Sequence, residues 1–359
     1  MQALIYRDGK MRVGEIDEPR PAAGQALVKT LACGICGSDL HFVRHAHHVV
    51  ETSTRIGGGF PIDLGRDIVL GHEFSGEIVE RGRGPNALAA GTRVCSIPFA
   101  HADGAGQSLG FSAERPGGYG QYMVLNESNL IPVPNGLSAE HAALTEPMAV
   151  GLHAVNRARI LPDDVALVIG CGPIGLAVIA ALKIQGVRDI VAADFSASRR
   201  RVAEAMGATL VIDPATVSPY DSWAAAAYPQ GYQPGSLDAF LKVGPQPRPS
   251  VIFECVGVPG MLQRVFEGAL AGTRIVVVGV CMEPDRFEPL FPLNKENDVI
   301  FCFYYSGEEY ARSLHHIAEG LIDVAPLMSR TVGLNEATDA FAALESGAED
   351  IKIIVDPWK

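Results

Sequence analysis

The residues best suited to chemistry lie in two short segments of the N-terminal third of the chain. The first, Cys33–His41, has the sequence Cys-Gly-Ile-Cys-Gly-Ser-Asp-Leu-His, and the second is Gly71-His72-Glu73. Thiolate, imidazole and carboxylate groups are all good ligands for zinc, and a catalytic zinc takes three protein ligands and keeps one position open. Alone, the Cys33-x-x-Cys36 spacing also fits a redox pair, and His72-Glu73 carries little information. Their combination is more informative than either segment.

A second chemical motif is Gly170-Cys-Gly172-Pro173-Ile174-Gly175, a G-x-G-x-x-G sequence between an apolar run and a helical pattern. The first glycine permits a tight turn, the second lets a pyrophosphate approach the backbone, and the third lets helix pack on strand. Free N–H groups at the helix start bind phosphate. Glycines of a buried turn also serve packing alone, so the motif needs its context.

That context is Asp194, which ends the next predicted strand 19 residues after Gly175. This is close to the spacing of a ribose-binding carboxylate. Asp194 favours NAD over NADP, because a 2′-phosphate would meet an unpaired negative charge; the alternative is that Asp194 caps a helix. Arg199 opens an arginine triplet. It can reach the adenosine ribose, accommodate a 2′-phosphate, or solvate a helix face.

The surrounding pattern predicts the elements that carry these motifs. Buried parallel strands are expected at 165–169, 189–193, 251–255 and 275–280, with a helix at 173–184, which indicates a parallel sheet with crossover helices. The stretch 214–250 is interpreted as an irregular insertion with one short helix. The first 150 residues are strand-rich, with a surface lobe at 99–118. Helical spacing at 308–320 and 335–346 precedes a closing strand at 351–355 that returns to the first domain.

Bulk properties exclude several classes of protein. A chain of 359 residues is long enough for two domains. Its net charge of −12 argues against nucleic acid and anionic membranes as partners. The start of the sequence shows no signal peptide, and the apolar runs are shorter than a membrane span. Seven scattered cysteines do not form a disulfide framework, so a reducing, cytoplasmic location is expected.

Several motifs, in this order and spacing, resemble those of the medium-chain, zinc-dependent alcohol and polyol dehydrogenase family, which includes sorbitol, butanediol and threonine dehydrogenases. The matching segments cover essentially the whole chain and are 34–41, 71–73, 117–122, 146–147, 170–175 and 352–357. The resemblance implies an α/β fold with a Rossmann-type, doubly wound parallel sheet domain at 155–296. Residues 1–154 and 297–359 would form a GroES-like, β-rich catalytic domain.

The resemblance also implies roles for individual residues. Zinc would be held by Cys36, His72 and Glu73, with Glu146 as an alternating ligand or as partner of the bound water. Ser38 and His41 match the proton relay of the family, and Asp39 would orient the site. Cys33 is interpreted as a small buried strand residue. The implied reaction is hydride transfer between a secondary alcohol or polyol, or the matching ketone, and NAD.

The chain departs from many of its relatives in two places. Four closely spaced cysteines hold a structural zinc in many members, but residues 96–120 contain no cysteine and Cys95 stands alone. One catalytic zinc and no structural zinc are therefore expected. The long stretch between His41 and His72 is interpreted as a solvated surface loop or, alternatively, as a lid over the substrate.

Two other functions and the assembly state complete the expectations. A zinc-free quinone or enone reductase of the same fold would lack the Cys36, His72 and Glu73 ligands. A non-catalytic nucleotide-binding protein would need neither the three metal ligands nor the proton relay of Ser38 and His41. Apolar strands at 275–280 and 299–305 resemble those that extend a sheet across a two-fold axis in the family, so a homodimer or homotetramer is expected.

Overall fold

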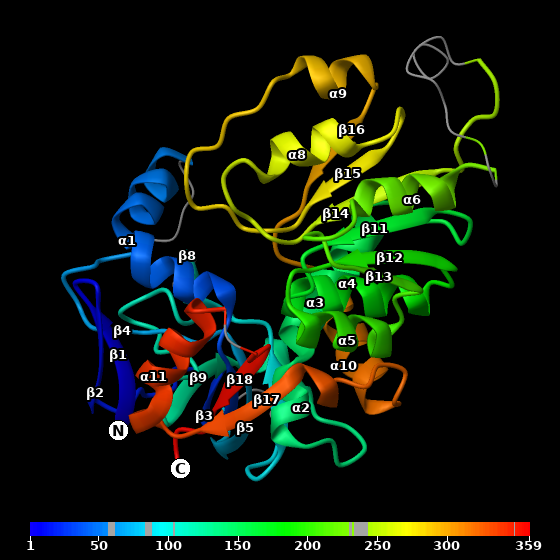
Figure 1. Ribbon diagram of the computed structural model, residues 1–359. Helices are drawn as coiled ribbons and strands as arrows, with labels where there is room; N and C mark the ends of the chain where they lie inside the picture. The colour runs from blue at the N-terminus through cyan, green and yellow to red at the C-terminus, as the bar shows by residue number, and fades with distance from the viewer. Residues whose placement is uncertain (57–61, 83–87, 103–104, 230–231, 233–242, 348) are drawn as a thin grey trace. The chain divides into compact units, whose positions relative to one another are not determined.

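The structure is a computed structural model that describes residues 1–359 except 57–61, 83–87, 103–104, 230–231, 233–242 and 348 (Figure 1). The chain forms two compact units. Met1–Glu146 and Tyr310–Lys359 make the first, and Pro147–Glu309 make the second. None of the helices in the described part of the chain is long and apolar enough to cross a membrane.

The second unit is built on six parallel strands. They are β11 (Val165–Ile169), β12 (Asp189–Ala193), β13 (Leu210–Ile212), β14 (Ser250–Glu254), β15 (Arg274–Val277) and β16 (Asp298–Phe301). Their order across the sheet is β13-β12-β11-β14-β15-β16. This is the doubly wound arrangement of dinucleotide-binding domains, in which the chain switches direction between the first and fourth strands. The Rossmann-type fold expected from the sequence is confirmed.

Helices cover both faces of this sheet. In Figure 1, α6 (Pro219–Ala227) and α8 (Met261–Gly268) lie on one face, and α4 (Pro173–Ile184) and α5 (Ala197–Met206) lie on the other. The unit also contains α3 (Thr145–Arg157), which starts in the first unit, and the short α9 (Leu290–Asn294). The helix α6 lies in the predicted 214–250 insertion. Its buried Trp223 donates a hydrogen bond of 2.9 Å to the carbonyl oxygen of Val165, which fixes α6 on β11.

The first unit is rich in antiparallel strands. Its larger sheet has the order β10-β6-β5-β3-β18-β17, with β9 also paired to β3, and a second sheet has the order β2-β1-β4. The strands are β1 (Gln2–Arg7), β2 (Lys10–Glu15), β3 (Gln25–Gly34), β4 (Ile68–Val69), β5 (Glu73–Glu80), β6 (Arg93–Ser96), β7 (Phe99–Ala102), β8 (Ala105–Ser108), β9 (Tyr122–Asn126), β10 (Leu130–Pro132), β17 (Met328–Val332) and β18 (Lys352–Val355). The helices are α1 (Gly37–Ile56), α2 (Ala139–Ala143), α10 (Gly307–Ala318) and α11 (Leu334–Glu345).

The C-terminal strand closes the first unit, as the sequence predicted. β18 pairs antiparallel with β3, placing Ile354 opposite Gly34 and Val355 opposite Cys33. It also pairs in parallel with β17. The strand is therefore inserted in the interior of the sheet, and all four of its side chains are buried.

The structure corrects the interpretation of the stretch after His41. Residues 42–56 are helical and belong to α1, so they do not form the solvated loop that was expected. The helix is kinked at His45, and it buries Phe42 and Ala46 against the core of the unit. Arg44 anchors it further, 3.0 Å from the carboxylate of Glu345. The many His and Arg residues obscured this apolar stripe in the sequence.

The compact units divide the chain at positions other than the predicted domain bounds. The predicted nucleotide domain ended at residue 296, but the unit continues to Glu309. The reason is β16, which pairs in parallel with β15 and adds a sixth strand to the sheet. The apolar run at 299–305 forms a strand only as far as Phe301.

Candidate active site

Strand pairing brings the predicted metal ligands together. Cys36 follows the end of β3, and His72 and Glu73 stand at the start of β5. Because β3 and β5 are antiparallel neighbours with Gly34 opposite Glu73, the end of one strand meets the start of the other. One potential ligand atom from each of Cys36, His72 and Glu73 lies within 4.8 Å of the other two. A sulfur, a nitrogen and an oxygen at this separation match the donor set of a zinc site.

Asp39 and Tyr119 orient the imidazole of His72. Oδ1 of Asp39 lies 3.3 Å from Nδ1 of His72, which is an ion-pair distance. Among the described residues, neither atom has a hydrogen-bond partner. The other oxygen of Asp39 accepts hydrogen bonds from the Tyr119 hydroxyl at 2.7 Å and from the Cys36 backbone N–H at 3.2 Å. With Nδ1 directed at Asp39, Nε2 is the His72 nitrogen left to bind a metal, and carboxylates commonly orient ligand histidines in this way.

The charges at this site are strongly coupled. Burial alone lowers the pKa of His72, but the charges of Asp39 and Cys36 raise it well above its usual value. Burial raises the pKa of Asp39, yet His72 and the hydrogen bond from Tyr119 leave it below its usual value. A metal binds neutral imidazole, so a cation at Cys36, His72 and Glu73 would take the place of a proton in this cluster. The residues therefore fit a divalent metal.

Lys352 is a site residue that the sequence analysis missed. It is only 1% exposed, and its Nζ donates hydrogen bonds to both carboxylate oxygens of Glu73, at 2.8 and 2.6 Å, and to the Ile35 carbonyl oxygen at 2.9 Å. Burial lowers the pKa of Lys352, but the charge of Glu73 raises it overall. The Glu73 carboxylate is thus already paired with the Lys352 ammonium group. A metal bound at Glu73 would share the carboxylate with this lysine.

Glycines allow the chain to approach the site closely. Gly71, immediately before His72, has φ of +97°. A Cβ on Gly117 would lie 2.4 Å from the Gly71 carbonyl oxygen, and one on Gly118 would lie 2.6 Å from the sulfur of Cys33. The close approach of Gly117 and Gly118 to Gly71 and Cys33 places Tyr119 against Asp39. Cys33 is fully buried in β3, which confirms its interpretation as a small strand residue.

The predicted relay residues and the predicted alternating ligand, Glu146, occupy different positions around the cluster of Cys36, His72 and Glu73. Oγ of Ser38 lies 3.4 Å from Nε2 of His72, the nitrogen that is left to bind a metal. His41 is half-buried, one turn further along α1. Glu146 is buried at the start of α3 and its charge raises the pKa of Lys352. Within the part of the chain that the structure describes, the metal-ligand group contains Cys36, His72 and Glu73 but not Glu146.

The glycine motif has the geometry of a phosphate-binding turn. Gly170 follows β11 with φ of +90°. A Cβ on Gly175 would lie 1.8 Å from the Gly170 carbonyl oxygen, so only glycine lets α4 start this close to the strand. At Gly172, the residue before the first turn of α4, a Cβ would meet nothing within 4 Å, which leaves the backbone open to a ligand. Pro173 and Ile174 begin the helix, where free N–H groups favour an anion.

Asp194 is tied to this turn and does not cap the next helix. Its Oδ2 accepts a hydrogen bond of 2.8 Å from the N–H of Cys171, and its Oδ1 accepts one of 2.7 Å from Ser196. Ser196 is the N-cap of α5, which removes the capping alternative for Asp194. Nε of Arg199 is buried without a hydrogen-bond partner among the described residues. An unsatisfied donor beside the turn fits a site for an oxygen-rich ligand.

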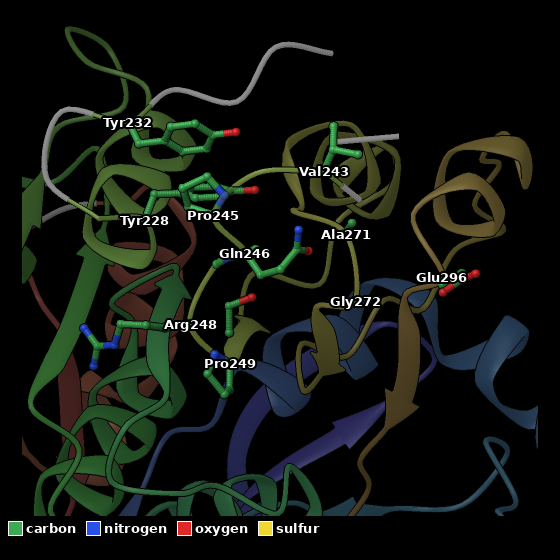
Figure 2. A pocket seen from close by; sticks show the side chains of 12 residues that line it. Tyr228, Tyr232, Val243, Pro245, Gln246, Arg248, Pro249, Ala271, Gly272 and Glu296 are labelled. Carbon is green, nitrogen blue, oxygen red and sulfur yellow. The ribbon is translucent and has the colours of Figure 1, made fainter. Parts of the chain in front are cut away.

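A cavity elsewhere in the second unit is separate from the glycine motif. It has a volume of about 320 Å³ and is lined by residues that include Tyr228, Tyr232, Ser250 and Gly272 (Figure 2). Ser250 starts β14 and Gly272 precedes β15, so the cavity lies at the amino ends of the strands. The glycine motif follows the carboxyl end of β11, at the opposite edge of the sheet.

A doubly wound sheet with a glycine turn and a Cys-His-Glu cluster are the features expected of a nucleotide-dependent dehydrogenase with a metal site. Comparison with known proteins agrees with this class. Residues 22–135 match the alcohol dehydrogenase GroES-like domain and residues 173–319 match the zinc-binding dehydrogenase family. (R,R)-butanediol dehydrogenase of Bacillus subtilis is 32% identical, covering 99% of this chain and 100% of the relative. Bovine sorbitol dehydrogenase is 28% identical, covering 97% of this chain and 93% of the relative.

Solved structures lead to the same conclusion. A zinc-binding dehydrogenase from Sinorhizobium meliloti bound to NADP has a TM-score of 0.80 at 28% identity, covering 99% of both chains. The 2R,3R-butanediol dehydrogenase of Bacillus subtilis has a TM-score of 0.76 at 29% identity, also covering 99% of both chains. The chain belongs to the medium-chain, zinc-dependent alcohol and polyol dehydrogenase family, as its motifs indicated. It is an oxidoreductase of that class.

Proposed function

We propose that this protein binds one catalytic zinc and transfers hydride between a secondary alcohol or polyol and NAD. The observation that carries the proposal is the convergence of Cys36, His72 and Glu73 within 4.8 Å of one another. Relatives named for butanediol and sorbitol oxidation support a small substrate with adjacent hydroxyl groups. A zinc-free quinone or enone reductase does not need this donor set. A non-catalytic nucleotide-binding protein would need neither the donors nor Ser38 beside them.

Several residues of the first unit have separate roles in removing the substrate proton. Zinc, when bound, supplies a Lewis acid that lowers the pKa of a coordinated hydroxyl group. Ser38 would accept the hydroxyl proton as its own proton leaves toward His41 by way of the cofactor ribose, and the imidazole of His41 would release a proton to water. Asp39 and Tyr119 hold His72 in one orientation during these steps. We assign Glu146 to the metal-bound water or to an alternating ligand position.

Metal content and activity test this function together. Purified protein is expected to hold about one zinc per chain, since the Cys-His-Glu group fits a single ion. Cys36→Ser should remove zinc and alcohol-dependent NAD reduction while leaving the far-ultraviolet circular dichroism spectrum unchanged. Cys302→Ser, at a half-buried cysteine of the other unit, is the matched control and should retain both. Two tightly held zincs by elemental analysis, or a fully active Cys36→Ser protein, would contradict the proposal.

We propose NAD as the cofactor, held by Gly170, Gly172, Pro173, Ile174 and Gly175 at its pyrophosphate and by Asp194 and Arg199 at its adenosine ribose. The support is the carboxylate of Asp194, which faces the turn through the Cys171 N–H. Bound NAD supplies the hydride acceptor. A 2′-phosphate would meet the Asp194 charge, although a similar structure holds NADP.

Cofactor preference can be measured directly. Asp194→Ala should weaken NAD by about tenfold and improve NADP relative to wild type, because a hydrogen-bonding carboxylate and a repulsive charge are removed together. The ratio of kcat/KM for the two cofactors reports the change. Asp213→Ala, at the carboxylate that pairs with Arg200 further along the same edge, is the control for altered charge. A wild type that already prefers NADP would refute the assignment of Asp194.

We also propose a homodimer or homotetramer assembled through β16. This strand ends the sheet, and its side chain of Phe301 is 66% exposed, followed by Phe303 at 78%. Leu290 and Leu293 of α9 add exposed apolar surface. An uncovered apolar edge strand favours pairing with a second copy. Light scattering at micromolar concentration should give at least a dimer, and Phe301→Asp with Phe303→Asp should shift it toward monomer; a monomeric wild type would contradict this.

The cysteines support a reducing location. All seven are free thiols in the structure. Burial raises the pKa of Cys95 and that of Cys171 to about 12, so neither forms a reactive thiolate. We therefore propose that the enzyme works in the cytoplasm on a small-molecule alcohol.

A further inference from the structure

Glu254 is a buried carboxyl at the carboxyl end of β14 with an unusual set of partners. Its side chain is 2% exposed, and its Oε1 accepts hydrogen bonds from the N–H groups of Val256 at 2.7 Å and Gly257 at 2.8 Å. Its backbone carbonyl oxygen accepts N–H groups from Val278 at 2.9 Å and Gly279 at 2.8 Å. One residue thus contacts the segment after β14 and the segment after β15.

These two segments are the β14 loop (residues 255–260) and the β15 loop (residues 278–281). They cross so closely that side chains are excluded between them. Gly257 has φ of +69°, and a Cβ on it would lie 2.6 Å from the backbone nitrogen of Val280. A Cβ on Gly279 would lie 2.3 Å from the nitrogen of Gly257 and 2.9 Å from Oε2 of Glu254. The crossing therefore depends on Glu254 and on two glycines.

The crossing adjoins the dinucleotide turn. The N–H of Cys255 donates to the Ile169 carbonyl oxygen at 2.9 Å, and a Cβ on Gly170 would lie 2.8 Å from Val256. In a doubly wound sheet the dinucleotide lies across the carboxyl ends of the strands at the point where strand order reverses. Asp194, to which we assigned the adenosine ribose, follows β12 on one side of that point. The nicotinamide half must then extend over the ends of β14 and β15, where the two loops cross.

The charge environment of Glu254 sets it apart from an ordinary structural residue. Burial raises the pKa of Glu254, only partly opposed by the Gly257 and Val256 N–H groups. No ion pair within the described part of the chain includes Glu254. A buried carboxyl without a cationic partner lowers stability. Departures of this kind from ordinary packing tend to occur at functional positions.

We propose that Glu254 is a positioning residue for the nicotinamide half of the dinucleotide. By holding the β14 and β15 loops together, it shapes the surface on which that half binds. The adenosine half, held by the Gly170–Gly175 turn and Asp194, does not depend on it. This inference rests on the proposed function, since it requires that the second unit bind a nicotinamide dinucleotide.

The experiment compares a complete dinucleotide with one that lacks nicotinamide. NAD, NADH and ADP-ribose are titrated by calorimetry into purified wild type, Glu254→Gln and Glu267→Gln. The last variant makes the same chemical change at an exposed glutamate of α8. Glu254→Gln should raise the Kd of NAD and NADH by about tenfold, the effect of weakening two hydrogen bonds to a charged group. Its Kd for ADP-ribose should stay within about twofold of wild type, and Glu267→Gln should match wild type for all three.

Other results distinguish failure of the inference from failure of the function. Equal weakening of NAD and ADP-ribose would assign Glu254 a general structural role, and an unchanged Kd for NAD would remove it from cofactor binding; either overturns the inference. A wild type that binds neither ligand overturns the proposed function and this inference with it. If Glu254→Gln does not fold, Gly279→Ala replaces it, because the added methyl group disturbs the crossing directly. It should show the same selective loss of NAD and NADH, and equal loss of ADP-ribose would again overturn the inference.

Discussion

Replacing Lys352 by methionine is expected to lower the free energy of unfolding of the zinc-free protein by about 3–5 kcal/mol, the usual loss when one partner of a buried ion pair is removed. The substitution leaves the Glu73 carboxylate fully buried without the Nζ that lies 2.6 and 2.8 Å from its oxygens. Because methionine fills a similar volume, the loss of stability comes mainly from the missing charge and not from a cavity. Denaturant unfolding in the presence of a chelator measures the loss.

Two comparisons isolate the charge. The double variant Lys352→Met, Glu73→Gln should recover most of the stability, because neither charge is left alone in the interior. Added zinc should also recover stability in Lys352→Met, since a bound cation replaces the missing charge beside Glu73. Arg330→Met breaks a partly exposed pair with Asp350 and should cost about 1 kcal/mol or less. Equal losses in the single and double variants, unaffected by zinc, would show that Lys352 acts by packing alone.

The second large effect is expected from Ser38→Ala, which should slow alcohol oxidation at neutral pH by about 10²–10⁴-fold, the range of general acid–base contributions. The variant removes the hydroxyl group 3.4 Å from Nε2 of His72, which is the first group of the proposed proton relay. His41→Gln, further along the relay, should cost about 10²-fold or less. Its loss should shrink at high pH or with imidazole buffers, because solvent bases then accept the proton directly.

Steady-state kinetics across pH, with zinc analysis of each protein, measures both variants. Zinc content and the KM for NAD should stay near wild type in each. His47→Gln, at an exposed histidine of the same helix, is the matched control and should leave the pH profile unchanged. Full activity and an unaltered profile in His41→Gln would remove that residue from the relay while leaving the zinc assignment intact.

Local motifs made the metal and dinucleotide regions predictable from the sequence. The glycine turn and the Asp194 position follow from neighbouring strands of regular spacing, and the structure places them at one edge of the sheet. Cys36 and His72 are separated by more chain, and the structure places Cys36 just after β3 and His72 just before β5. Their proximity depends on the pairing of β3 with β5, which the sequence alone does not specify.

Long-range contacts explain what the sequence did not predict. Lys352 lies 279 positions from Glu73, and a lone lysine in an apolar C-terminal strand gives no indication of its partner. The role of Tyr119 depends in the same way on a backbone crossing with Gly71. The helical nature of residues 42–56 was obscured by its charged side chains, since the buried stripe contains only a few apolar residues, among them Phe42 and Ala46.

The position of β18 inside the sheet has a consequence for the order in which the protein can mature. The second unit is one continuous segment, Pro147–Glu309, so a ribosome releases all of its strands before the first unit has its last one. In the first unit, β3 lacks its pairing with β18, and Glu73 lacks its ion pair with Lys352, until β18 emerges. The metal ligands are thus made early in synthesis, while the cation that neutralises one of them arrives last. Chains interrupted late in translation would carry a complete set of ligands around an uncompensated charge.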